Sequence, residues 1–188
     1  MQGLRNRAVL ITVLAATTAY AVLRYNVLKG VEWEHVPLYV LNKSLAWSAV
    51  VLWALGAWQA LKTRSDLLAS ARVAEGSALA GVHVLMSLVL LGPERYPLLF
   101  GPARQLTGAA EVSLLAGVVA AACLSGARRS VGLVVVFSVA ALVHATILGV
   151  RNWIAPTTWP GYLVPITLWS ALAALVCAVL AMVWARRR

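Results

Sequence analysis

The sequence predicts an all-α integral membrane protein, a six-helix bundle with both termini in the cytoplasm. Three observations support this fold class. Of the 188 residues, 62% are hydrophobic and only 12% are charged, against about 25% charged in an ordinary soluble domain. Six long apolar stretches follow one another, and basic residues gather in every second connection between them. The composition excludes a soluble globular domain, and its hydrophobicity excludes disorder.

Each of the six stretches is long enough to cross a bilayer, which takes about 20 apolar residues with a range of about 17–25. The chain forms a single transmembrane domain over residues 1–188, with expected helices at 8–25, 38–61, 73–91, 106–124, 131–150 and 165–184. Backbone groups must be paired in lipid, so only helices or barrel strands can span it. Strict period-2 alternation is absent, which favours helices.

The first stretch follows Arg5 and Arg7, as a signal peptide would. It ends in Val22-Leu23-Arg24 and lacks a small-x-small cleavage site. We therefore expect a retained helix.

The connections predict the orientation. One set carries ten basic residues and two acidic ones: Arg5, Arg7, Lys62, Arg64, Arg72, Arg128, Arg129, Arg186, Arg187 and Arg188, with Asp66 and Glu75. The opposite set carries six basic and four acidic residues: Arg24, Lys29, Lys43, Arg95, Arg104 and Arg151, with Glu32, Glu34, Glu94 and Glu111. Because lysine and arginine favour the cytoplasmic side, the first set is expected there. The expected location is a bacterial inner membrane.

The two cysteines and the net charge have simple explanations. Cys123 and Cys177 lie in apolar stretches and are expected to be buried, inert thiols. The formal charge of +10 reflects membrane orientation, so no nucleic-acid partner is expected.

Charged or titratable residues inside membrane spans indicate function. His83 lies nine residues before Gly92, and His144 lies seven before Arg151, roughly 13 and 10 Å below the outer ends of their helices. Two imidazoles at nearly one depth suit the two axial positions of a haem iron. Small residues at helical spacing around both histidines (Gly76, Ala80, Ser87, Ala140, Ala141 and Ala145) leave room for a macrocycle. The alternative is that these residues serve helix packing alone.

Haem propionates need cations near the outer surface. Lys43 and one arginine, Arg151 among the candidates, are expected to supply them. The alternative is that these long side chains extend to the headgroups. Glu111 either pairs with Lys43 or Arg104 or serves as a proton site, and its role stays open, as does that of His35.

Two stretches, 72–87 around His83 and 128–146 around His144, resemble the histidine helices of ferric-reductase-like transmembrane proteins. That family includes the haem-binding membrane subunit of the periplasmic methionine sulfoxide reductase system. Residues 152–161, Asn-Trp-Ile-Ala-Pro-Thr-Thr-Trp-Pro-Gly, resemble the outer loop of some small bacterial members, and the resemblance covers about 72–165. Two-haem members carry a second histidine thirteen residues away, where this chain has Ser70 and Val131. The resemblance therefore implies one haem, in the outer half.

The sequence thus predicts a b-type cytochrome-like electron-transfer protein, ferric-reductase-like, with one haem b ligated by His83 and His144. Its redox partner is expected to be quinol or an extracytoplasmic protein, and whether it is an enzyme stays open. One alternative is a cofactor-free scaffold or accessory subunit that binds an extracytoplasmic partner through aromatic outer loops. Another is a proton-coupled transporter that uses Lys43, Glu111 and the two histidines.

Overall fold

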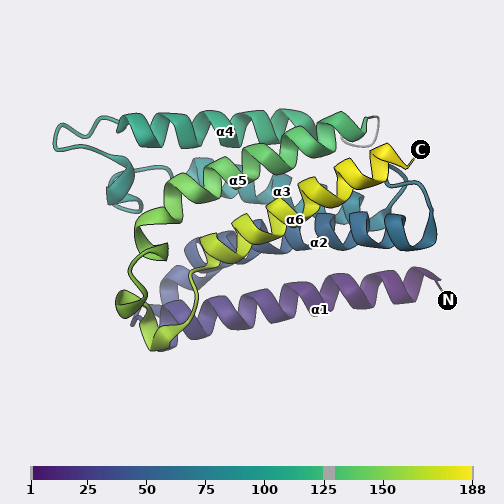
Figure 1. Ribbon diagram of the computed structural model, residues 1–188. Coiled ribbons are helices and arrows are strands. Elements are labelled where there is room, and N and C mark those ends of the chain that lie inside the picture. Colours follow the sequence, from purple (N-terminus) through teal and green to yellow (C-terminus); the bar gives the residue numbers. More distant parts are fainter. Residues whose placement is uncertain (1, 125–129, 188) are drawn as a thin grey trace.

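The computed structural model describes residues 2–124 and 130–187, without the side chains of residues 2–6 and of residue 98. The described residues fold into six α-helices that run side by side, with both ends of the chain at the same end of the bundle (Figure 1). Their bounds are α1 (Gln2–Val22), α2 (Leu41–Thr63), α3 (Ala71–Leu90), α4 (Gly108–Leu124), α5 (Val131–Trp153) and α6 (Ile166–Arg186). This confirms the all-α class. We call the end that holds both termini the terminal end and the other the far end.

Five segments are long and apolar enough to cross a membrane, and they contain α1, α2, α3, α5 and α6. Helices of this length and composition indicate a protein embedded in a lipid bilayer. The sixth helix, α4, is apolar but has only 17 residues, at the lower limit for a span. The sixth crossing and the cytoplasmic placement of the termini therefore stay predictions.

The helix bounds differ most from expectation in the N-terminal part of the chain. The first helix begins at Gln2 and continues past Val22 through a π-helical turn, η1 (Leu23–Val27). A short 3-10 turn, η2 (Trp33–His35), and a second π-helical turn, η3 (Val36–Val40), then lead into α2. Helical hydrogen bonds form in polar sequence as readily as in apolar sequence, so hydropathy marks the membrane-embedded part and not the whole helix.

The helices pack as an arc in which α2 has a central place. It contacts α1, α3 and α6 extensively, α6 packs on α5, and α5 packs on α4. In Figure 1, α1 and α4 lie on opposite outer sides of the bundle. Among the described residues, α3 makes few contacts with α4 and almost none with α5. The helix α3 is therefore held in the bundle mainly by α2.

The terminal half of the bundle is filled by apolar side chains. Trp53 of α2 is fully buried and stacks on Phe137 of α5, with ring centroids 3.9 Å apart. Alanines of α2 and α6 belong to the same core and include Ala57, Ala174 and Ala181, all nearly inaccessible. Small residues let membrane helices approach closely, so this half of the bundle is densely packed.

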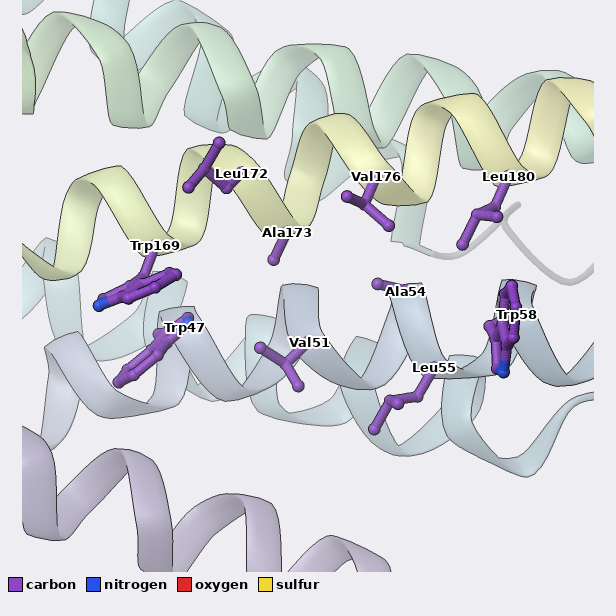
Figure 2. Close-up of a pocket in the computed structure, with 10 residues that line it drawn as sticks. All are labelled: Trp47, Val51, Ala54, Leu55, Trp58, Trp169, Leu172, Ala173, Val176 and Leu180. Atoms are coloured by element: carbon purple, nitrogen blue, oxygen red, sulfur yellow. The ribbon is translucent and has the colours of Figure 1, made fainter.

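An apolar groove of about 430 Å³ runs along the surface between α2 and α6 (Figure 2). Trp47 and Trp169 lie stacked in it, with ring centroids 6.4 Å apart, and the rest of its lining is aliphatic apart from a third tryptophan, Trp58.

Candidate functional site

His83 lies on α3, seven residues before the last residue of that helix at the far end. Its Nδ1 is 2.7 Å from the side-chain oxygen of Asn42 and 3.1 Å from the backbone oxygen of the same residue. Asn42, at the start of α2, is buried and donates its amide N–H to the Ser87 hydroxyl at 3.0 Å. That bond directs the Asn42 carbonyl oxygen toward the imidazole. Because both Asn42 oxygens can only accept, His83 carries its proton on Nδ1.

His144 has an equivalent arrangement on α5. Its Nδ1 is 2.8 Å from the backbone oxygen of Ser113 and 3.0 Å from the Ser113 hydroxyl. Ser113 lies on α4 and is buried. A backbone oxygen only accepts, so this imidazole also carries its proton on Nδ1. The lone pair of each neutral ring is then on Nε2, which is the nitrogen left to bind a metal.

The two imidazoles lie near one another. They are close enough to interact electrostatically, although His83 is held by α2 and His144 by α4. Among the described residues, neither Nε2 takes part in a hydrogen bond with the protein. Each ring is thus fixed through Nδ1, and its Nε2 is the nitrogen that would bind a metal.

The small residues near the histidines have different roles. Gly76 does not leave space for a cofactor as expected, because a Cβ there would collide with the Trp53 indole. Gly117 of α4 borders His144, where a Cβ would lie 3.5 Å from Nδ1. Ala80 and Ala140 are buried in the apolar core. Among the described residues, α3 packs less closely against α4 and α5 than against α2.

Lys43 occupies an aromatic cage at the far end. Its ammonium lies 4.4 Å from the ring centroid of Tyr39, 5.4 Å from that of Tyr25 and 5.6 Å from that of Tyr96. Cations over aromatic faces are attracted by the ring quadrupole. Lys43 also lies close enough to His83 to interact with it electrostatically.

The remaining polar candidates lie near the surface. Arg151, in the last turn of α5, is exposed. Glu111 is also exposed, and no ion pair joins it to Arg104 or Lys43 within the described residues; Arg104 pairs with Glu94 at 2.9 Å. His35 lies 4.0 Å from each of two exposed carboxylates, those of Glu32 and Glu34, away from the other histidines along the chain.

The thiols of Cys123 and Cys177 are free and buried.

Sequence reasoning missed the partners of the histidines. Asn42 and Ser113 are polar residues inside apolar helices, and both are almost fully buried. A buried polar side chain requires a hydrogen-bond partner. That requirement was a usable signal, although it does not say which histidine each residue meets.

Comparison with protein-family models, with curated proteins and with solved structures finds no match for this chain. The assignment of a function therefore rests on the geometry of the site.

Proposed function

We propose that this chain is a b-type cytochrome-like membrane protein that transfers electrons and holds one haem b between His83 and His144. The observation that carries the proposal is the matched state of the two imidazoles. Each donates its Nδ1 proton to an oxygen of a neighbouring helix, and each leaves Nε2 without a protein partner within the described residues. Metal-binding histidines are commonly oriented by such a bond from the second ring nitrogen.

The surroundings support one haem rather than two. The terminal half of the bundle is occupied by the Trp53–Phe137 stack and the buried alanines of α2 and α6. Ser70 and Val131, thirteen residues from the two histidines, offer no ligand to iron. The far half has the two imidazoles, and among the described residues α3 as a whole contacts α4 sparsely and α5 hardly at all.

A bound haem supplies an iron that exchanges one electron between two oxidation states. The chain has three tasks around it. Asn42 and Ser113 hold the imidazoles in one tautomer, and the apolar helices keep water away. Lys43 and Arg151 lie at the far end, where they would balance propionate charge. The redox partner we propose is a quinol or an extracytoplasmic protein, in line with the resemblance to ferric-reductase-like proteins.

Absorption spectroscopy of the purified chain after expression with ample haem tests this proposal. We expect a Soret band and the sharp α and β bands of low-spin bis-histidine haem in the reduced protein. His83→Ala and His144→Ala should each abolish the low-spin spectrum, while His35→Ala, the matched control, should keep it. A folded protein without a Soret band would overturn the proposal and favour a cofactor-free scaffold in which Asn42 and Ser113 serve helix packing.

A further inference from the structure

Three cationic side chains surround the ring of Tyr25 in η1, at the far end of the bundle. The Arg24 guanidinium carbon and the Lys29 ammonium each lie 5.9 Å from the ring centroid, and the Lys43 ammonium lies 5.4 Å from it. All three cations therefore contact the same ring, and we call them the Tyr25 cluster.

The Tyr25 cluster has no counter-charge from the described part of the chain. Within the described residues, the ion pairs do not include Arg24, Lys29 or Lys43. They join His35 to Glu32 and Glu34, Arg72 to Glu75, and Arg104 to Glu94. Like charges gathered at the edge of a low-dielectric region repel one another unless an anion lies between them. The arrangement therefore favours a bound anion.

Arg24 adds an unmet hydrogen-bonding requirement. Its side chain is only 6% exposed, and one terminal nitrogen donates to the Leu163 backbone carbonyl. Its Nε is buried and has no hydrogen-bond partner in the described structure. A buried charged donor without an acceptor is costly, and an anionic oxygen is the acceptor that a guanidinium binds best.

We infer that the Tyr25 cluster binds the phosphate of an anionic lipid headgroup. The cluster lies where apolar helices end and tyrosines gather, which is the headgroup level of a bilayer. Arg24 and Lys29 follow α1, whereas His83 lies on α3 beside Asn42 of α2 and His144 lies on α5 beside Ser113 of α4. Lys43 belongs to both proposals, because it also lies close enough to His83 to interact with it electrostatically. Lys29 belongs to the lipid site alone, so Lys29→Gln tests that site independently of the haem.

Native mass spectrometry of the full chain in detergent tests the site, with dioleoyl phosphatidylglycerol as the probe. Dioleoylglycerol has the same tails without the phosphate, and inorganic phosphate has no tails. We expect phosphatidylglycerol to bind and both other probes to bind much more weakly. Lys29→Gln and Lys43→Gln should each weaken phosphatidylglycerol binding about fivefold.

The matched control is Arg95→Gln, because Arg95 is an exposed cation at the same end of the bundle. It should leave phosphatidylglycerol binding within twofold of the unaltered chain. Equal binding by the lysine variants and the control would overturn the inference. So would full competition by inorganic phosphate, which would make free phosphate the ligand. Loss of haem retention with unchanged lipid binding would instead make the lysines propionate partners.

Discussion

Replacing Asn42 by leucine should weaken haem binding far more than an equivalent change beside His144. The Asn42 side-chain oxygen, at 2.7 Å, is the nearest acceptor for His83 Nδ1, whereas the nearest acceptor for His144 is a backbone oxygen at 2.8 Å. Substitution of the Asn42 side chain removes the nearest acceptor of His83 and leaves it only the longer contact of 3.1 Å to the Asn42 backbone oxygen. Substitution of the Ser113 side chain leaves the nearest acceptor of His144 in place. Loss of such an orienting partner costs about 10–100-fold in metal affinity, or about 1.4–2.8 kcal/mol. We expect Asn42→Leu to fall in this range and Ser113→Ala to show a much smaller loss.

Titration of purified, haem-depleted protein with haem, followed at the Soret band, measures the two affinities. Asn42→Asp is the matched control, because its carboxylate keeps an acceptor for His83 Nδ1 and can accept from the Ser87 hydroxyl. It should retain bis-histidine binding, and the added negative charge should lower the reduction potential. Circular dichroism and size-exclusion chromatography establish that each variant is folded. Equal haem affinity for folded Asn42→Leu and for the unaltered chain would refute the proposed role of Asn42.

Three further predictions concern the fold. Gly76→Ala should lower the free energy of unfolding by about 1–3 kcal/mol through overpacking, measured by thermal unfolding in detergent. Gly81→Ala is the control, because a Cβ at Gly81 would meet no neighbouring atom within 4 Å, and it should not lower the free energy of unfolding. Equal effects of the two substitutions would contradict the packing described. Thr17 of α1 and Ser48 of α2 share a hydrogen bond of 2.6 Å. A double-mutant cycle with Thr17→Val and Ser48→Ala should give a coupling free energy of about 0.6 kcal/mol. A coupling free energy of zero would count against this bond. The predicted topology places the C-terminus in the cytoplasm. Green fluorescent protein fused to the C-terminus should therefore fluoresce, and alkaline phosphatase fused to the same position should be inactive. The reverse result would invert the predicted topology.

Much of the helical architecture was predictable because a membrane helix satisfies its backbone hydrogen bonds within itself. The stretch expected at 131–150 begins at the same residue as α5, and the stretch expected at 106–124 ends with α4. Hydropathy failed where helices extend beyond the apolar stretch, as at Gln2, and where π-helical turns join the first two helices to their connection. Five of the six expected spans correspond to segments that are long and apolar enough to cross a membrane, and the sixth, at α4, stays a prediction.

The candidate site was predictable only in part. A histidine inside an apolar stretch is conspicuous in the sequence, and the rise of a helix places it at a depth. Which neighbour a side chain meets depends on the rotation of each helix about its axis, and helices that are apolar on most faces do not reveal that rotation. Asn42 and Ser113 therefore became visible as partners of the histidines only once α2 and α4 were packed in place. For the same reason Gly76, expected beside a cofactor, instead makes room for an indole.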